Sequence, residues 1–189
     1  MKFYHGSPVG GLTELQPSEA RQFGKPRQVC MSALRAMALL YLIDNFEYTY
    51  GYDKSGRIYY EEYFPDSLEK LYGGKSGYLY ECAAGEYQTT KIPNEYVSPV
   101  PVRTLSCEYI PDAYLALREA ADRGEIRLVP YDQITEGTRK FVWRWISGDI
   151  VAKRLWETGG PYADYLKRNY PEIWNKTILE NGVTEDVCR

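Results

Sequence analysis

The sequence is poor in the side chains that bind metal ions or crosslink small secreted domains. Its 189 residues include one histidine, His5, and four cysteines, at positions 30, 82, 107 and 188. The cysteines lie far apart and form no Cys-x-x-Cys pair. Zinc sites need closely spaced ligand pairs, and disulfide frameworks are typical of short cysteine-rich chains. The sequence therefore predicts neither a zinc site nor a disulfide scaffold.

Long apolar runs and long basic runs are also absent. The longest apolar stretch, residues 33–43, is too short and too interrupted to span a bilayer. The few apolar residues after Met1 are broken by His5 and Gly6, unlike a signal peptide. We therefore expect a cytoplasmic protein with no membrane partner. The formal net charge of −3, without a Lys/Arg cluster, argues against binding nucleic acid by neutralising phosphates.

Tyrosine, in contrast, is abundant, with 19 residues. Its apolar ring and polar hydroxyl suit flat, partly polar ligands, but they suit a tyrosine-rich β core equally well. Residues 48–76 are rich in tyrosine, glycine, aspartate and lysine. This segment is interpreted as a lid over a site, as an acceptor platform, or as a plain insertion.

Strand and helix patterns alternate along the first two thirds of the chain. Helical spacing of apolar residues predicts a helix over 33–46 with Ser32 as its N-cap. Pro111 and Gly124 bound a second predicted helix, over 111–124. The other predicted elements are strands at 2–5, 27–31, 78–83 and 125–131, a β-like stretch at 85–92, an interrupted edge or bulged strand over 94–109, a hairpin around 53–56, and a short helix after Pro65-Asp66.

From Thr135 the pattern is amphipathic helix without strand signals, and all four tryptophans lie in this part. We therefore expect an α+β domain over 1–133 and a helical extension over 134–189 packed on it.

Three short stretches carry the functional prediction. They are FYHGS (3–7), VCMSALRAMALLY (29–41) and NEYVSPVPV (94–102). Together they resemble the His–Tyr–Glu branch of the ADP-ribosyltransferase superfamily, which includes poly-ADP-ribose-polymerase-like and diphtheria-toxin-like enzymes. The resemblance covers about residues 1–130. It implies a split antiparallel β core and NAD as the substrate.

For the first stretch, the resemblance implies that the His5 imidazole binds a ribose hydroxyl of NAD. It also implies that the Gly6 backbone pairs with the nicotinamide carboxamide, because a side chain there would block close approach. Ser7, in the same motif, is assigned to the same binding site.

For the second stretch, the family has a strand tyrosine and, eleven residues later, a helix tyrosine that sandwich the nicotinamide ring. Here Cys30 occupies the strand position and Tyr41 the helix position. Ala38 falls where the family has a small residue, often a serine that bonds the carboxamide. Ser32 is interpreted either as a helix cap or as a ligand contact. Because position 30 is a cysteine, one aromatic wall of the nicotinamide-binding slot is missing unless another tyrosine supplies it.

For the third stretch, the resemblance implies that Glu95 is the catalytic acid. Cleavage of the nicotinamide–ribose bond develops positive charge on the ribose, which a carboxylate bonded to the 2′-hydroxyl stabilises. The same carboxylate can orient or deprotonate the acceptor. Glu81, Glu86 and Glu108 are alternative acids on or near predicted strands.

The resemblance therefore implies an NAD-dependent mono-ADP-ribosyltransferase, a glycosyltransferase that releases nicotinamide, and we expect it to need no metal. The acceptor is unidentified: a protein, a nucleic acid, a small molecule or water. Arg21, Lys25 and Arg27 are candidates to contact the diphosphate. The cysteine at position 30 keeps open a non-catalytic module that binds NAD or ADP-ribose as a sensor or sequestering protein. A third interpretation, RNA 2′-phosphate transfer, normally requires several basic residues in the site, and the acidic balance of this sequence argues against it.

Overall fold

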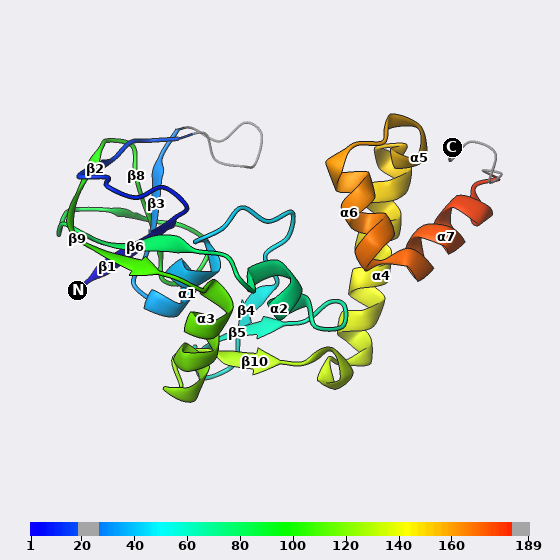
Figure 1. The fold of residues 1–189 in the computed structure, drawn as a ribbon, viewed down its shortest axis with the longest axis horizontal. Coiled ribbons are helices and arrows are strands. Elements are labelled where there is room, and N and C mark those ends of the chain that lie inside the picture. The colour runs from blue at the N-terminus through cyan, green and yellow to red at the C-terminus, as the bar shows by residue number, and fades with distance from the viewer. Residues whose placement is uncertain (19–26, 183–189) are drawn as a thin grey trace. The chain divides into compact units, whose positions relative to one another are not determined.

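The computed structural model describes residues 1–18 and 27–182, which form two compact units. Unit 1 contains residues 1–60 and 68–128 (Figure 1). Unit 2 contains residues 61–67 and the chain from 129 onward. The division differs from the expected one because the backbone N–H of Glu62 donates to the carbonyl of Val129 at 3.0 Å. This bond ties segment 61–67 to the start of the C-terminal part.

Unit 1 is built on an antiparallel sheet with the strand order β2-β9-β6-β1-β3-β8-β7. The central strand β1 pairs with β6 along its whole length but with β3 through a single pair, Tyr4 with Ser32. The strands are β1 (Phe3–Ser7), β2 (Glu14–Leu15), β3 (Val29–Ser32), β6 (Gly77–Cys82), β7 (Gln88–Thr89), β8 (Glu95–Ser98) and β9 (Val102–Ile110).

The two faces of this sheet are covered differently. One face buries an apolar cluster to which β1 contributes Phe3 and β3 contributes Val29 and Met31. Because side chains alternate along a strand, Gly6 lies on the other face, and there β1 packs against the helix α1 (Arg35–Leu40). The remaining members of the cluster are Leu15, Tyr80, Cys82 and Val102.

Helix α1 is much shorter than the predicted helix over 33–46, and that prediction is wrong in both bounds. Ser32 is not its N-cap: Ser32 belongs to β3, its hydroxyl accepts the N–H of Leu34 at 2.9 Å, and Leu34 occupies the cap position. At the other end, the Tyr48 hydroxyl donates to the carbonyl of Ile43 and accepts the N–H of Asn45. Helix α1 ends before these groups, where the N–H groups of Tyr41 and Leu42 donate to carbonyls three residues back, and the Tyr48 phenol holds the turn that follows.

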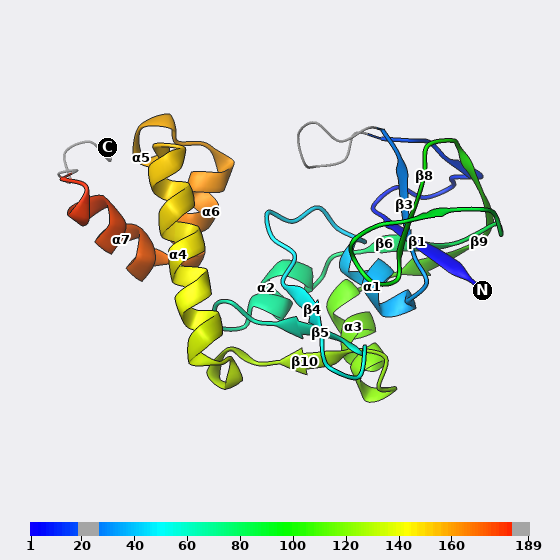
Figure 2. The ribbon, with the colours of Figure 1, turned by 180° about the vertical axis from the view of Figure 1, so that it is seen from behind.

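A second sheet lies in unit 1 except for its terminal residues Glu61 and Val129, which belong to unit 2. Its order is β10-β5-β4, with β4 (Tyr50–Tyr52), β5 (Ile58–Glu61) and β10 (Arg127–Val129). The predicted hairpin around 53–56 is confirmed, and Asp53 Oδ1 accepts the N–H groups of Ser55 and Arg57 in its turn. The predicted helices are present as α2 (Ser67–Tyr72) and α3 (Ala113–Asp122), with Asp112 as the N-cap of α3. Helices α1 and α3 lie side by side in Figures 1 and 2.

The predicted strand over 94–109 is interrupted as expected, at residues 99–101. Strand β8 is not at the edge of the sheet, but β9 has a register shift between Thr104 and Ser106 where it pairs with β6, which agrees with the bulged alternative. The two-residue strand β7 pairs with β8 and forms the edge of the sheet. Of the β-like stretch predicted for 85–92, only these two residues are a strand.

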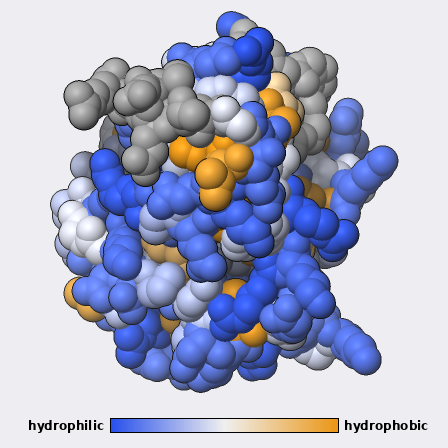
Figure 3. Space-filling model, turned by 90° about the vertical axis from the view of Figure 1, so that its right-hand side faces the viewer, coloured by the Kyte–Doolittle hydropathy of each residue, from blue (hydrophilic) through white to orange (hydrophobic). Residues whose placement is uncertain are grey.

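The described part of unit 2 consists mainly of helices from Glu136 onward. Helix α4 packs against α7, and α7 also packs against α6. Phe64 from segment 61–67 contacts the rings of Tyr165 and Tyr170. Figure 3 shows a mainly hydrophilic face with small separate apolar patches. The helices are α4 (Glu136–Ala152), α5 (Leu155–Thr158), α6 (Pro161–Asn169) and α7 (Pro171–Glu180), preceded by the 3₁₀ turn η1 (Tyr131–Gln133).

Antiparallel sheets with separate helices confirm the α+β class. Within residues 1–18 and 27–182, each helix is too short or too polar to cross a membrane.

Candidate functional site

Three adjacent strands of unit 1 bring the sequence-predicted residues into one region. Tyr4 of β1 pairs with Ser32 of β3, and Ser32 pairs with Glu95, the first residue of β8. Cys30 precedes Ser32 by two residues on β3 and therefore shares a sheet face with it and with Glu95. Glu95 thus lies two strands away from β1, on the face that carries Cys30.

His5 lies where the pairing between β1 and β3 stops. Its Nδ1 atom is 2.8 Å from the carbonyl oxygen of Cys30. In the neutral imidazole, Nδ1 carries the proton that it donates to this carbonyl, which leaves Nε2 as an acceptor. Burial lowers the pKa of His5 below its ordinary value of 6.5, although the bond to Cys30 opposes this effect. His5 is therefore neutral at neutral pH and offers an acceptor nitrogen.

We predict that an NMR titration of the His5 imidazole gives a pKa below 6.5 in the folded protein. The signal is unambiguous because the chain has one histidine. Since the unfolded state binds the proton first, the stabilising contribution of neutral His5 is complete above pH 6.5 and is lost as the pH falls through the folded-state pKa. His5→Gln should remove this component from the pH dependence of urea unfolding. A folded-state pKa at or above 6.5 would contradict the burial of the ring.

The missing side chain of Gly6 is explained by packing inside the protein. A Cβ atom at Gly6 would lie 2.1 Å from the carbonyl oxygen of Ala38 and 3.0 Å from the nitrogen of Leu42. The glycine therefore allows α1 to lie directly on β1. Ala38 is itself buried, as are Ser7, whose hydroxyl accepts the N–H of Val9, and Ser32.

Tyr41 directly follows α1 and belongs to a cluster of tyrosines. Its ring stacks on that of Tyr48, with centroids 4.7 Å apart and planes inclined by 28°. Its hydroxyl lies 2.8 Å from the hydroxyl of Tyr50, which comes from β4. Tyr52 lies edge-on to Tyr50, and its hydroxyl donates to the carbonyl of Pro93 at 2.6 Å. The tyrosine-rich segment thus connects Tyr41 to the turn that precedes Glu95.

The electrostatics of these phenols show which groups lie close to one another. Burial raises the pKa of Tyr41 far above its usual range, and the bond to Tyr50 and the nearby Glu95 and Cys30 raise it further. The pKa of Tyr50 is also raised, mainly by burial, with contributions from the same Glu95 and Cys30. Burial raises the pKa of Tyr52 to about 12. Tyr41, Tyr50, Glu95 and Cys30 therefore share one environment in which the phenols stay neutral.

Glu95 is held in place by the turn before β8. Its Oε2 atom accepts a hydrogen bond from the Thr90 hydroxyl at 2.6 Å, and that hydroxyl also accepts the N–H of Ile92. The carbonyl of Asn94, a residue with a φ of 60°, accepts the N–H of Ala33 at 2.9 Å. The carboxylate is half-buried.

The alternative acids have other surroundings. Glu81 pairs with Lys2 at 2.8 Å, and Glu108 receives two bonds from Arg35, at 2.7 and 2.9 Å. Glu86 is exposed between β6 and β7. Of the four acids considered from the sequence, Glu95 is the one whose charge acts on the tyrosine cluster.

The structure brings Tyr41, Cys30 and Glu95 together. His5 leaves β1 on the other face of the sheet, the face of Phe3, and is linked to this group through the carbonyl of Cys30. Tyr48, Tyr50 and Tyr52 were not predicted as site residues, although their spacing of two is a strand signal. Arg27 is exposed, and Arg21 and Lys25 lie outside the described residues. Among residues 1–18 and 27–182, no group of three or more His, Cys, Asp and Glu side chains is placed to hold a metal ion.

Comparison with protein-family models finds no match, and comparisons with curated proteins and with solved structures find none either.

Proposed function

We propose that unit 1 is an NAD-dependent mono-ADP-ribosyltransferase that transfers ADP-ribose to an acceptor and releases nicotinamide. One observation carries the proposal: the half-buried carboxylate of Glu95 and the phenol of Tyr41 share one environment with Cys30, whose carbonyl holds His5. These residues come from β8, the end of α1, β3 and β1. The single residue pair that joins β1 to β3 supports an ADP-ribosyltransferase-like split of the β core at this place.

In this proposal His5 and Tyr41 bind NAD. Neutral His5, with Nδ1 engaged by Cys30, uses Nε2 to accept a hydrogen bond from a ribose hydroxyl. Tyr48 covers one face of the Tyr41 ring, so the opposite face is the one on which the nicotinamide ring stacks. Gly6 contributes its backbone, since the space of a side chain is occupied by α1.

Glu95 performs the chemical step. Its carboxylate accepts a hydrogen bond from the ribose 2′-hydroxyl and stabilises the positive charge that develops as the bond to nicotinamide breaks. Thr90, which donates to Oε2, fixes the carboxylate and leaves Oε1 for the substrate. Glu95 can then orient or deprotonate the acceptor that attacks the ribose.

Tyr50 replaces the strand tyrosine that is absent at position 30. Its hydroxyl bonds that of Tyr41, its ring lies edge-on to Tyr41 at 6.1 Å, and Glu95 and Cys30 both act on its pKa. In this proposal, the second aromatic wall comes from the tyrosine-rich segment rather than from β3.

We expect the wild-type protein to release nicotinamide from NAD, measured by chromatography, and to bind NAD in calorimetry. Stacking of one base on an aromatic side chain contributes about 1–3 kcal/mol, so Tyr41→Ala and Tyr50→Ala should each raise KM for NAD about tenfold or more. Tyr114→Ala, on α3 and in contact with Arg118, is the matched control and should leave KM unchanged. A wild-type protein that neither binds NAD nor releases nicotinamide would reject the proposal.

A second candidate function is supported by Cys30 itself, which stands where the family has the strand tyrosine. In that case unit 1 binds NAD or ADP-ribose without turning it over, as a sensor or sequestering module. The same assay separates the two functions, because a binding module gives a calorimetric signal and no nicotinamide.

A further inference from the structure

The residues before Glu95 form a tight turn of a defined type. The N–H of Glu95 donates to the carbonyl of Ile92 at 3.2 Å, which closes a turn of four residues. Pro93 is the second residue of this turn, and Asn94, with a φ of 60°, is the third. A proline fixes its φ near about −65°, and a positive φ at the next residue then defines a type II turn. The peptide group between Pro93 and Asn94 is therefore flipped relative to a type I turn.

Asn94 makes the type II form costly. The third position of such a turn favours glycine, because a side chain disfavours a positive φ, although asparagine tolerates it better than most residues. A type I turn would place Asn94 at a negative φ, and proline at the second position suits both types. A contact that holds the flipped peptide group therefore decides which of the two types is populated.

Tyr52 supplies this contact. Its hydroxyl donates to the carbonyl oxygen of Pro93 at 2.6 Å, and this carbonyl belongs to the flipped peptide group. Burial raises the pKa of Tyr52 to about 12, so the hydroxyl keeps its proton at neutral pH. The hydroxyl oxygen also lies 3.3 Å from Sδ of Met37, a buried residue of α1. In a type I turn the Pro93 carbonyl would point to the opposite side, and the hydrogen bond from Tyr52 would be lost.

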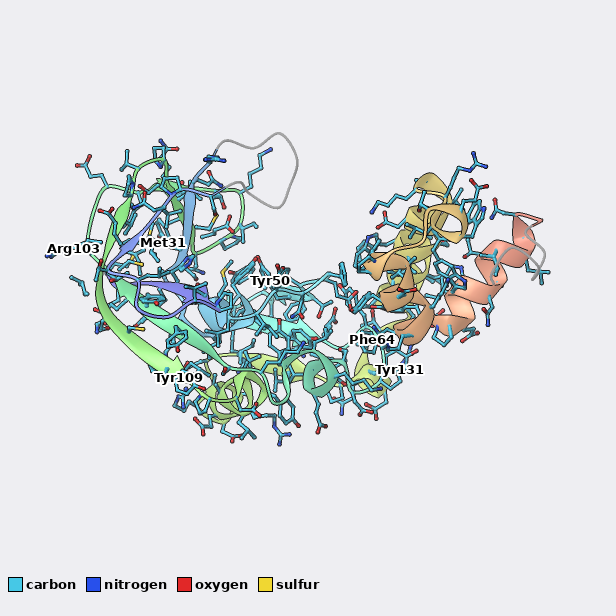
Figure 4. All side chains as sticks on the ribbon, turned by 45° about the horizontal axis from the view of Figure 1, so that its top comes forward. Met31, Tyr50, Phe64, Arg103, Tyr109 and Tyr131 are labelled. Carbon is cyan, nitrogen blue, oxygen red and sulfur yellow. The ribbon has the colours of Figure 1, made fainter. Side chains whose placement is uncertain are left out.

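Tyr52 is itself fixed by its strand. It pairs with Ile58 in the β4–β5 hairpin, and Ile58 is fully buried. Tyr50, labelled in Figure 4, lies two residues earlier on β4 and therefore on the same sheet face as Tyr52. The two rings are edge-on, with centroids 6.4 Å apart. The strand that carries Tyr50 thus also holds the turn before Glu95.

The turn carries the groups that hold the Glu95 carboxylate. The N–H of Ile92, its first residue, donates at 3.0 Å to the Thr90 hydroxyl, and that hydroxyl donates to Oε2 of Glu95. The carbonyl of Asn94 accepts the N–H of Ala33, which directly follows β3. A change in the turn would therefore disturb both the donor to the carboxylate and the junction between β3 and β8.

We infer that Tyr52 is a positioning residue: its hydroxyl holds the turn 92–95 in the type II form and thereby fixes the carboxylate of Glu95. Tyr52 acts through the turn, whereas Tyr41 and Tyr50 are assigned to NAD itself. Its effect on the reaction rests on the proposed function, but its effect on the turn does not.

Tyr52→Phe keeps the ring and removes the hydrogen bond to Pro93. The equilibrium between the type II form and other forms of the turn should shift by about 2–10-fold, the range that one hydrogen bond provides. The amides of Ala33 and Glu95 should then exchange with deuterium faster by about the same factor, measured by NMR. The kcat for nicotinamide release should fall by about 2–10-fold, while KM for NAD stays unchanged.

Asn94→Gly, added to Tyr52→Phe, should restore both the slow exchange and kcat. Glycine adopts a positive φ without a side-chain clash, so the type II turn no longer depends on the Tyr52 hydroxyl. Tyr59→Phe is the matched control, since it removes a hydroxyl from the paired strand β5, where the ring lies 5.2 Å from the Arg127 guanidinium. It should change neither the exchange rates nor kcat.

Unchanged exchange of the Ala33 and Glu95 amides in Tyr52→Phe would overturn the inference. An unchanged kcat in this variant, or a loss of kcat that Asn94→Gly does not restore, would overturn it as well. A wild-type protein that releases no nicotinamide rejects the proposed function instead, and the exchange rates then decide alone whether Tyr52 holds the turn.

Discussion

Replacement of Glu95 by glutamine is expected to lower the rate of nicotinamide release by a factor on the order of 10²–10³ while NAD still binds. Glutamine keeps the shape of the side chain and an oxygen that accepts the Thr90 hydroxyl, but it removes the negative charge that stabilises the ribosyl cation. The measurement is kcat for nicotinamide release together with the Kd for NAD from calorimetry.

The matched control is Glu86→Gln, which makes the same chemical change at an exposed position between β6 and β7 and should leave kcat unchanged. Thr90→Val should lower kcat less than Glu95→Gln does, because it removes the bond that positions the carboxylate but keeps its charge. Thr90→Ser, which retains the hydroxyl, should restore it. An unchanged kcat in Glu95→Gln would remove this residue from the mechanism.

The largest effect on stability is expected from Gly6→Ala, which should lower the free energy of unfolding by about 3 kcal/mol or more. The added Cβ would overlap the carbonyl oxygen of Ala38, a backbone atom that cannot rotate away. Either α1 must move off β1 or the sheet must deform. Urea unfolding followed by hydrogen exchange of the β1 and β6 amides reports on this region.

Gly148→Ala provides the opposite case. Gly148 lies in α4, and an added Cβ there meets no atom within 4 Å. Alanine is more favourable than glycine in a helix, so this variant should stabilise unit 2 by about 0.5–1 kcal/mol. All four tryptophans lie in unit 2, so their fluorescence reports its unfolding.

If Gly6→Ala leaves the unfolding midpoint unchanged, β1 and α1 do not pack as the structure has them.

The elements that the sequence predicts well are those fixed by local chemistry. Asp112 caps α3 through its own side chain, and Asp53 closes its hairpin within four residues. The end of α1 is fixed differently. The N–H groups of Tyr41 and Leu42 donate to carbonyls three residues back, the Tyr48 hydroxyl holds the turn that follows, and apolar spacing over 33–46 carries no sign of either.

The candidate site shows the same division. His5, Tyr41 and Glu95 are found by a resemblance of short motifs, but Tyr50 and Tyr52 are not, because their positions depend on the fold of the β4–β5 hairpin over distant segments. The packing reason for Gly6 was also missed, since it requires the path of α1 to be known.

The division of the chain into units has a practical consequence for protein engineering. Phe64 has 3% of its surface accessible, and its ring contacts those of Tyr165 and Tyr170 in the C-terminal helices, about a hundred residues later in the chain. A protein truncated after residue 133 would therefore lack the residues that cover the Phe64 ring, and the exposed ring would promote aggregation. An independent unit 1 would require residues 61–67 to be excised and bridged by a polar turn.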